Sequence, residues 1–212
     1  MKQFENFHVV DHPLIQHKLS LIREKSTDHK VFRELVTEVA ILLAFELTRD
    51  FATKPTKIGT PMASTTGNIL SGKDVVLVPI LRAGLGMVDG LLQMIPNARV
   101  GYAGMERDEE THKPVPYYFK IPKKSGNRRF IILDPMLATG GTAIASANRL
   151  KDLGATRIKF MCLIAAPEGR DVFCKTHPDI EVYTASLDEK LDDKKYIIPG
   201  LGDAGDRLFG TK

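Results

Sequence analysis

Apolar residues follow a helical repeat through the first fifty residues of the chain. Between Pro13 and Glu24 they fall on one face, which predicts a first helix. A second helix is predicted to start after the capping candidates Ser-Thr-Asp at positions 26–28 and to run as far as Phe51. Its apolar residues keep the helical period: Val31, Leu35, Val39, Leu42 and Leu43. Because this apolar face is broad, we expect the second helix to pack against other protein surface.

From Asp74 onward, short apolar runs bounded by turns replace the helical repeat. Val75–Ile80, Phe130–Leu133 and Ile158–Ala165 are almost continuously apolar, as are strands buried on both faces of a sheet. Helix-like segments separate or follow these strands. The alternation predicts an α/β fold, in which helices flank a mainly parallel twisted sheet with right-handed crossovers.

A different pattern lies between the first two of these strands. Ala98–Met105 and Val115–Ile121 flank the polar segment Glu106–Pro114, which predicts a protruding β-hairpin rather than another crossover unit. No repeat, low-complexity tract or long linker interrupts the sequence, and 212 residues suit one hydrophobic core. We therefore predict a single domain over residues 1–212.

Charge and composition narrow the picture only slightly. The formal net charge of +4 is small for this length, so it implies no nucleic-acid partner, although it suits an anionic substrate. No run approaches the roughly eighteen apolar residues of a membrane span, and Met1–Asp11 lacks the features of a secretory signal. We therefore expect a cytoplasmic protein with no membrane partner. Cys162 and Cys174 match no zinc spacing, and we expect both to be reduced and structural.

One loop carries the clearest chemistry in the sequence. The predicted strand Phe130–Leu133 ends in Asp134, and Pro135-Met-Leu-Ala-Thr-Gly-Gly-Thr142 then leads into a helical run. Its two glycines let backbone N–H groups approach a ligand closely, and a helix N-terminus adds positive potential. The two threonines can add hydroxyl donors. This combination favours a phosphate group at the carboxyl edge of the sheet.

The same loop has a plainer interpretation, in which Thr-Gly-Gly-Thr supplies only a tight turn and a helix cap. Asp134 favours the ligand site, because a carboxylate placed there can accept hydrogen bonds from ribose hydroxyls. The lysine of a Walker loop and the Gly-x-Gly-x-x-Gly of a dinucleotide loop are both missing from it. What remains is a site for one phosphate beside an acid suited to ribose.

The segment Asp134-Pro-Met-Leu-Ala-Thr-Gly-Gly-Thr142 resembles the signature of the type I phosphoribosyltransferases. Most members have two adjacent acids there. The second is Pro135 here, and this form of the signature resembles the uracil phosphoribosyltransferase branch. The resemblance to that branch extends over essentially the whole chain. The resemblance implies binding of phosphoribosyl diphosphate (PRPP), with Mg²⁺ held mainly by that substrate and by no direct side-chain ligand. The implied PRPP contacts in this segment are Asp134, Pro135, Met136, Leu137, Ala138, Thr139, Gly140, Gly141 and Thr142.

Two arginines are candidates for binding a diphosphate group, because a guanidinium offers planar donors to anionic oxygens. Arg82, in Pro79-Ile-Leu-Arg-Ala-Gly84, follows a predicted strand and should lie at the same end of the sheet as Asp134. Arg107 lies in the polar tip Glu106–His112, where the residues alone favour solvent exposure. Both segments match uracil phosphoribosyltransferases, so the resemblance implies a diphosphate contact for both arginines.

The C-terminal segment Tyr196–Phe209 is rich in glycine but carries interleaved apolar anchors, which indicates an ordered loop. Uracil presents an acceptor, a donor and an acceptor along one edge, and backbone groups of a glycine-containing turn can match that row. The resemblance implies uracil contacts from Ile197, Gly202, Asp203 and Ala204. It also assigns Asp203 to PRPP and its metal, and the implied catalytic set is Arg82, Arg107, Asp134 and Asp203.

The resemblance implies transfer of the 5-phosphoribosyl group to N1 of uracil, giving UMP and diphosphate. It also suggests a homo-oligomer and a GTP effector, for which the sequence offers no location. Two alternatives stay open. The base could be hypoxanthine, guanine or orotate, although orotate would need a cation for its extra carboxylate and we expect none in the tail to serve it. The chain could instead be a regulatory RNA-binding protein with a basic cluster, which a solvated hairpin end explains more simply. That cluster comprises Lys120, Lys123, Lys124, Arg128 and Arg129.

Overall fold

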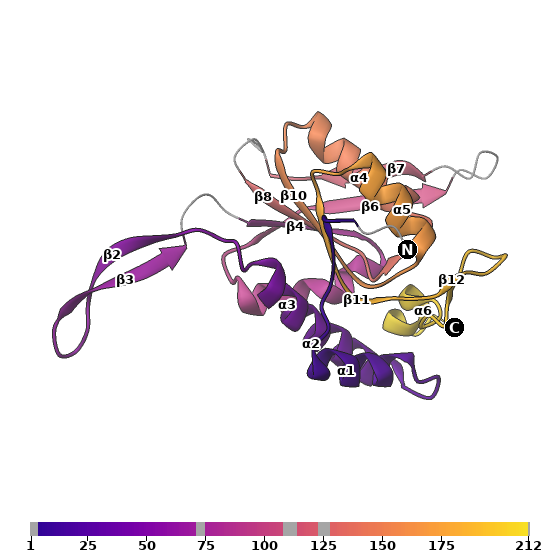
Figure 1. Ribbon diagram of the computed structural model, residues 1–212, viewed down its shortest axis with the longest axis horizontal. Helices are drawn as coiled ribbons and strands as arrows, with labels where there is room; N and C mark the ends of the chain where they lie inside the picture. The colour runs from indigo at the N-terminus through magenta and orange to yellow at the C-terminus, as the bar shows by residue number, and fades with distance from the viewer. Residues whose placement is uncertain (1–3, 71–74, 108–113, 123–127, 212) are drawn as a thin grey trace.

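The computed structural model describes residues 4–70, 75–107, 114–122 and 128–211, without the side chains of residues 106, 107 and 114 (Figure 1). The helices are α1 Pro13–Arg23, α2 His29–Leu47, the 3₁₀ helix η1 Ala83–Met87, α3 Val88–Met94, α4 Gly141–Asp152, α5 Pro167–Thr176 and α6 Ala204–Phe209. The strands of the main sheet are β1 Phe7–Val9, β4 Val75–Leu81, β5 Arg99–Val100, β6 Tyr102–Arg107, β7 Pro114–Lys120, β8 Arg129–Leu133, β9 Met136–Leu137, β10 Arg157–Ala165 and β11 Glu181–Leu187. Two separate hairpins consist of β2 Thr53–Gly59 with β3 Ser64–Leu70 and of β12 Lys190–Leu191 with β13 Ile197–Ile198.

The main sheet follows the order β1-β11-β10-β8-β4-β6-β7, with β5 also paired to β4 and β9 to β10. Every neighbouring pair along that path is parallel except β6 with β7. The predicted runs Val75–Ile80, Phe130–Leu133 and Ile158–Ala165 form β4, β8 and β10 in its centre. The expected α/β fold with a mainly parallel sheet is therefore confirmed.

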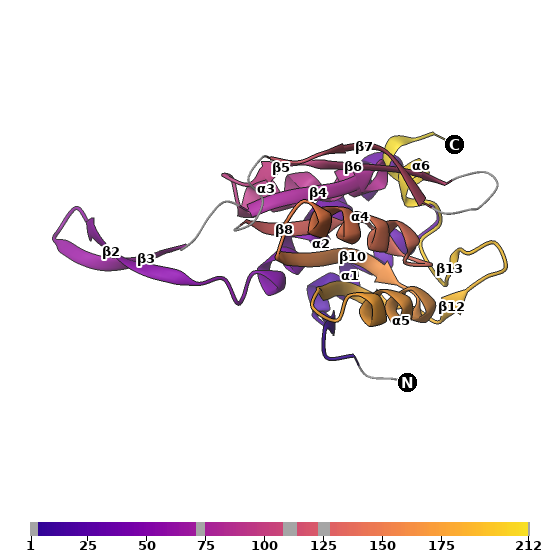
Figure 2. The same cartoon turned by 90° about the horizontal axis from the view of Figure 1, so that it is seen from above.

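Helices cover both faces of this sheet (Figure 2). α1, α2 and α3 share one hydrophobic core with the sheet, and α4 shares another with its opposite face. Successive residues of β4 alternate between the two: Val75 and Leu77 belong to the first core, whereas Val76 and Val78 belong to the second. A strand buried on both faces must be apolar at every position, which explains the continuous runs in the sequence.

The N-terminal helices form close to where the periodicity predicts them. α1 ends at Arg23, one residue before the predicted end, and α2 begins after Asp28, whose Oδ1 accepts the N–H groups of Lys30 at 2.8 Å and Val31 at 3.0 Å. The predicted end of α2 at Phe51 is wrong, because the helix stops at Leu47. The chain leaves the helical path after Leu47 to reach β2, six residues further on.

The predicted hairpin at Ala98–Ile121 is present, since β6 and β7 pair antiparallel. The expectation that it replaces a crossover is wrong. β6 also pairs in parallel with β4, through Ile80 with Ala103 and Leu81 with Gly104, so η1 and α3 form a crossover before the hairpin. The hairpin strands are thus the edge of the main sheet.

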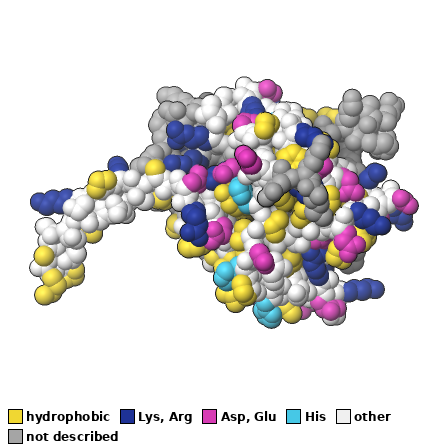
Figure 3. Space-filling model, in the orientation of Figure 1, with side chains coloured by type: hydrophobic (Ala, Val, Ile, Leu, Met, Phe, Trp, Pro, Cys, Tyr) yellow, Lys and Arg dark blue, Asp and Glu magenta, His cyan; other side chains and the backbone are white. Residues whose placement is uncertain are grey.

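A second hairpin, which the sequence analysis did not predict, projects from the body as an arm (Figure 1). This arm comprises residues 53–70 of β2, its turn and β3, which pair with each other in a seven-residue register. Nearly every arm residue is exposed, and Figure 3 shows hydrophobic side chains at its far end, where Met62 is 93% exposed. With no buried face, the arm lacks the apolar alternation that marks a strand in a sequence.

Both cysteines lie free in the interior, as predicted. Burial raises the pKa of the Cys162 thiol to about 12 and that of the Cys174 thiol to about 11. Such thiols stay protonated at neutral pH and are poor nucleophiles. They therefore belong to the packing of the sheet and α5 rather than to its chemistry.

Within the part of the chain that the structure describes, we find no helix whose length and hydropathy would allow it to span a bilayer.

Candidate active site

The residues predicted to carry chemistry follow strands whose carboxyl ends lie together. Asp134 follows β8 and Arg82 follows β4, and these two strands are parallel neighbours in the sheet. Ligands of open α/β sheets bind outside the carboxyl ends of the strands. This edge is therefore the candidate site.

The phosphate loop, residues 134–142, runs from β8 into α4. Met136 and Leu137 form the short strand β9 beside β10 before the chain turns into α4 at Gly140. Gly140 has a φ of +83°, which glycine adopts at little cost, and it precedes the first residue of α4. No side chain caps this helix start, so the first amides of the twelve-residue α4 remain suited to an anion.

Two further glycines allow neighbouring loops to pack directly on this region. A Cβ at Gly169, in the first turn of α5, would collide with the carbonyl oxygen of Ala138. A Cβ at Gly84, in η1, would collide with the carbonyl oxygen of Leu133, next to Asp134. Gly84 comes from a segment that carries the family resemblance, and the packing of the two glycines brings the Arg82 loop and α5 against this region.

Asp134 lies half-buried at the end of β8. Its Oδ1 accepts the N–H of Met136 at 3.4 Å, and its own N–H donates to the carbonyl of Met161 at 3.2 Å. Loss of hydration raises the pKa of its carboxyl from 3.8 to about 7, and the Met136 N–H opposes this rise only in part. Asp134 can therefore change its charge near neutral pH.

Arg82 lies between the phosphate loop and the C-terminal tail, defined as residues 196–211. Its side chain is 60% exposed, with Nη2 3.9 Å from Oδ1 of Asp206 and the guanidinium 5.7 Å from the ring centre of Phe209. The structure thus places Arg82 at the predicted end of the sheet, with its cation open to a ligand. Arg107 is the last residue of β6, and its side chain lies outside the described part of the structure.

The tail is ordered, as predicted, and packs beside the Arg82 loop. Ile197 lies in β13, and Ala204 begins α6; both are buried. Gly202, with a φ of +79°, is exposed, and Asp203 caps α6 by accepting the N–H of Asp206 at 2.9 Å. A Cβ at Gly86 of η1 would lie 2.7 Å from the Leu208 side chain, which shows how closely α6 approaches η1.

The residues that hold the tail in place were not among those predicted from the sequence. Arg23 and Asp188 bond both sides of Gly200. Arg207 donates to the carbonyls of Leu201, at 2.9 Å, and Ile22, at 2.5 Å. The contacts of Arg23 with Gly200 and of Arg207 with Ile22 join residues 177 and 185 positions apart, and no local sequence pattern signals such contacts.

The described residues contain no group of three or more His, Cys, Asp or Glu side chains arranged to hold a metal ion. At the site itself, Asp134 and Asp203 are the carboxylates of the predicted set, and Oδ1 of Asp203 already caps α6. This donor set fits a divalent cation that keeps most of its oxygen ligands from a phosphorylated substrate and from water, as Mg²⁺ does.

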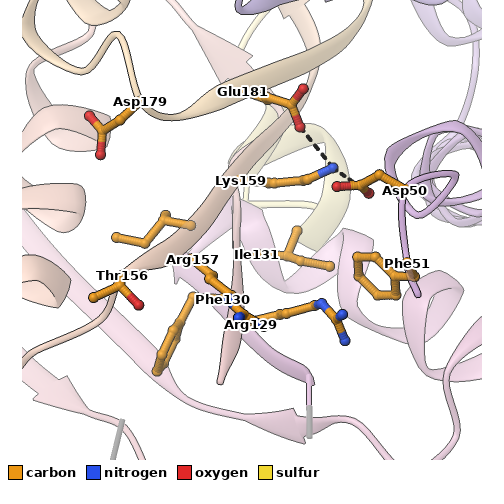
Figure 4. A pocket seen from close by; sticks show the side chains of 11 residues that line it. Asp50, Phe51, Arg129, Phe130, Ile131, Thr156, Arg157, Lys159, Asp179 and Glu181 are labelled. Carbon is orange, nitrogen blue, oxygen red and sulfur yellow. Dashed lines mark hydrogen bonds and ion pairs between the residues drawn. The ribbon is translucent and has the colours of Figure 1, made fainter. Parts of the chain in front are cut away.

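A cavity of about 270 Å³ lies at the opposite, amino end of the sheet (Figure 4). Its Lys159 is neutralised by Asp50 at 2.7 Å and Glu181 at 2.8 Å, and no predicted site residue whose side chain the structure describes lines it. Arg129, at its edge, stacks 4.6 Å from the ring centre of Phe51. We therefore place the chemistry at the carboxyl end. A hollow of about 600 Å³ borders the tail at Gly202 and Asp203, but neither Arg82 nor the phosphate loop lines it.

The basic cluster considered for RNA also lies away from the carboxyl end. Arg129 begins β8, and Lys120 pairs with Tyr102 at the start of β6, so both mark the amino end of the sheet. Lys123 and Lys124 fall outside the described residues. The described members thus lie opposite the phosphate loop.

Comparisons with known proteins agree with this geometry. The family model described as uracil phosphoribosyltransferase matches residues 9–211. A uracil phosphoribosyltransferase of Macrococcus caseolyticus is 60% identical, with 97% of this chain and 98% of the relative covered. That of Lactiplantibacillus plantarum is 59% identical, covering 97% and 99%. A solved structure of an Aquifex aeolicus protein has a TM-score of 0.91 at 38% identity and covers 97% of this chain and 99% of its own. A hypoxanthine phosphoribosyltransferase of Trypanosoma cruzi, with a TM-score of 0.53, 13% identity and 75% of each chain covered, shares the fold.

Proposed function

The chain belongs to the uracil phosphoribosyltransferase family, which forms UMP and diphosphate from uracil and PRPP in pyrimidine salvage, and we propose how its residues divide this work. The observation that carries the proposal is the meeting of three parts at one sheet edge. These are a loop suited to phosphate, an exposed arginine and an ordered glycine-rich tail.

We propose that the 5′-phosphate of PRPP binds the backbone amides of residues 138–142. The left-handed Gly140 and the uncapped start of α4 support this assignment, because they leave adjacent N–H groups for an anion. The hydroxyls of Thr139 and Thr142 add donors to the same phosphate. Asp134, at the mouth of the loop, accepts hydrogen bonds from the ribose hydroxyls, and it does so best as a carboxylate.

The leaving diphosphate faces Arg82 and Arg107 in this proposal. As the bond at the anomeric carbon lengthens, negative charge grows on the diphosphate, and guanidinium groups stabilise that charge most in the transition state. The exposed, loosely paired side chain of Arg82 supports its part, because its cation does not have to leave a strong internal ion pair. Uracil N1 forms the new bond from the opposite face, so orientation of the two substrates supplies much of the acceleration.

Uracil is bound by the tail, through Ile197, Gly202, Asp203 and Ala204. Backbone groups match its acceptor, donor and acceptor edge without bulky side chains in the way. Cytosine has a donor in place of one acceptor and lacks the N3 proton. Two such mismatches at roughly 1 to 3 kcal/mol each would exclude it. Hypoxanthine, guanine and orotate present other edges, and we expect no turnover with them.

We propose Mg²⁺ as the cation of this site; bound together with PRPP, it would neutralise charge on the diphosphate. Asp203 is the residue of this chain that we assign to that region, through a metal-bound water or as a base toward uracil. Its fixed place at the start of α6 supports either role, because the cap holds the carboxylate beside the Arg82 loop.

Three wider properties are also proposals: a cytoplasmic location, a homo-oligomeric state and a response to GTP as an effector. They rest on the family resemblance. Sedimentation velocity on the purified chain measures its assembly, and initial rates with added GTP measure the effector. Finding a monomer would contradict the proposed homo-oligomer, and a rate unchanged by GTP would contradict the proposed effector.

The decisive experiment for the reaction uses the purified chain, Mg²⁺, PRPP and a panel of bases. We expect UMP from uracil, no nucleotide from cytosine, hypoxanthine, guanine or orotate, and a dependence on added Mg²⁺. Nucleotide from another base would overturn the base assignment. An absence of any turnover, together with RNA binding that weakens steeply with salt, would favour the regulatory alternative.

A further inference from the structure

A pair of residues outside the predicted site holds the base-binding tail at one residue, Gly200. Building on the proposed function, we propose that Arg23 and Asp188 are positioning residues for uracil. They form a clamp on Gly200, defined as the contacts among these three residues, which fixes the backbone that reaches the base. Neither residue needs to touch a substrate for this role.

The clamp closes on Gly200 from both sides. Arg23 Nη1 donates to the Gly200 carbonyl at 2.7 Å, and Oδ2 of Asp188 accepts the Gly200 N–H at 3.0 Å. The two side chains also bond each other in a bidentate pair, from Nη1 to Oδ2 at 2.7 Å and from Nη2 to Oδ1 at 2.6 Å. Ser186 Oγ donates to Oδ1 at 2.7 Å, so both carboxylate oxygens are satisfied.

Gly200 lies between the residues assigned to uracil, three positions after Ile197 and two before Gly202. Its φ of +65° lies in the left-handed region that glycine adopts at little cost, and a Cβ there would collide with the Ile197 carbonyl oxygen. The backbone conformation of Gly200 therefore fixes the direction of the chain on both sides of this residue. A rotation at this residue would move the backbone groups of Ile197 and Gly202 relative to one another.

The clamp is anchored to the rigid part of the protein. Arg23 is the last residue of α1, and the Asp188 N–H donates to the Ala165 carbonyl at the end of β10 at 2.8 Å. β10 is also the strand that pairs with β9 of the phosphate loop. The uracil and phosphate parts of the site thus share one support.

The energetics favour orientation over stability as the role of this pair. The side chain of Asp188 is 1% exposed, and that of Arg23 is 23% exposed. In a buried ion pair, the attraction between the charges adds little stability beyond offsetting the hydration free energy that they lose. Its bidentate geometry nevertheless holds the two groups in one arrangement. Burial raises the pKa of the Asp188 carboxyl, but hydrogen bonds from Arg23, Ser186 and the Gly200 N–H together with the charge of Arg23 lower it further than burial raises it, so the carboxylate keeps its charge at neutral pH.

The test measures steady-state kinetics of Arg23→Met, Asp188→Asn and the milder Ser186→Ala in the full-length enzyme. We expect Arg23→Met to raise the KM for uracil about tenfold or more, with the KM for PRPP changed by less than about twofold. Arg23→Lys should recover part of the uracil affinity, because an ammonium keeps the charge but not the two-pronged geometry. The matched control is Lys159→Met, which breaks a part-buried ion pair at the other end of the sheet.

The amide signal of ¹⁵N-labelled Gly200 reports the clamp directly, through its protection from solvent exchange. Loss of that protection in a variant with unchanged KM for uracil would overturn the proposal. So would an equal rise of the KM for uracil in Lys159→Met, since the effect would then follow general destabilisation. If Arg23→Met does not fold, Asp188→Asn and Ser186→Ala make the same comparison. Failure of the proposed function is separate, because the unmodified chain would then form no UMP.

Discussion

The phosphate loop and the C-terminal tail serve one site but are shaped in opposite ways. The phosphate loop takes its form from consecutive residues: a strand end, a left-handed Gly140 and the start of α4. The tail takes its form from distant ones, since Arg23 bonds a residue 177 positions away and Arg207 bonds Ile22 across 185 positions. One half of the site is therefore local in sequence, and the other depends on the finished fold.

This difference predicts how each half fails. Changes within the phosphate loop or its arginines should alter the use of PRPP and spare uracil. Changes in the distant supports of the tail, or in the tail at residues other than Asp203, should alter the use of uracil and spare that of PRPP. The following experiments test that separation, from the largest expected effect to the smallest.

The largest effect should come from the diphosphate arginines. Arg82→Ala is expected to lower kcat/KM for PRPP by about 10² to 10³, because it removes a cation from the charge that develops on the leaving group. Arg107→Ala should do the same. Arg49→Ala is the matched control, since Arg49 also pairs with a carboxylate, on Glu46, and stacks 5.6 Å from Phe45. Equal losses in Arg49→Ala and Arg82→Ala, measured by initial rates, would refute the specific role.

The next effect compares two glycines flanking α4. Gly140→Ala should lower kcat/KM for PRPP by about 10², because it strains a φ of +83° and brings a Cβ to 3.1 Å from the Gly169 carbonyl. Gly154→Ala imposes a similar strain at a φ of +82°, with nothing within 4 Å of the new Cβ. It should lower the free energy of unfolding by about 1 kcal/mol and leave the kinetics unchanged. If both variants lose activity alike, strain in α4 rather than phosphate binding is responsible.

In the tail, Gly202→Val should raise the KM for uracil about tenfold and leave the KM for PRPP unchanged. The nearest atom to a Cβ at Gly202 is Cδ of Arg207 at 3.6 Å, so space is available. The cost comes from the φ of +79°, which a β-branched residue adopts poorly, at about 1 to 2 kcal/mol. If the folded variant keeps its uracil affinity, the proposal that the tail backbone binds uracil is wrong.

The smallest effect is a pH dependence from Asp134. Its pKa of about 7 means that the carboxyl gains charge between pH 6 and pH 8. PRPP affinity, measured by calorimetry, should rise several-fold over that range, because the charged form accepts hydrogen bonds from ribose better. Asp134→Asn should abolish this rise while leaving any titration of PRPP itself. An identical pH profile in both proteins would assign the dependence to the substrate.

Stability should move in the opposite direction. Because the pKa of Asp134 in the folded chain lies above the usual 3.8, the fold prefers the neutral form. Its contribution to stability is full below about pH 3.8 and is lost as the pH rises through about 7. In thermal unfolding without ligand, the stability of Asp134→Asn relative to the unmodified chain should therefore increase as the pH rises from 5 to 8. A constant difference between the two would contradict the raised pKa.

The sequence predicted the parts of the fold whose physics is local. The apolar runs of β4, β8 and β10 follow from burial on both faces, and the phosphate loop follows from a strand, two glycines and a helix start. The arm at 53–70 left no trace, because exposed strands carry no pattern of burial. The ion pair of Arg23 with Asp188 was equally invisible, because only the folded sheet brings α1 and the end of β11 together.

The base specificity came from the tail motif by resemblance, and the structure adds the reason for its order. Ile197, Leu201 and Leu208 are buried and anchor the tail on the same core as α1 and α2. A glycine-rich segment without such anchors would be a flexible end. The apolar residues between the glycines were therefore the informative signal.

The arm has a consequence for how the chain would respond to a protease. Its turn at residues 60–63 is an exposed tip of the kind that proteases cut first. A single cut there would divide the chain into two pieces, yet α2 from the first piece and β10 from the second help to build one core. The nicked protein should migrate as two fragments in denaturant and as one particle in native buffer, because the fold joins what the cut backbone no longer does.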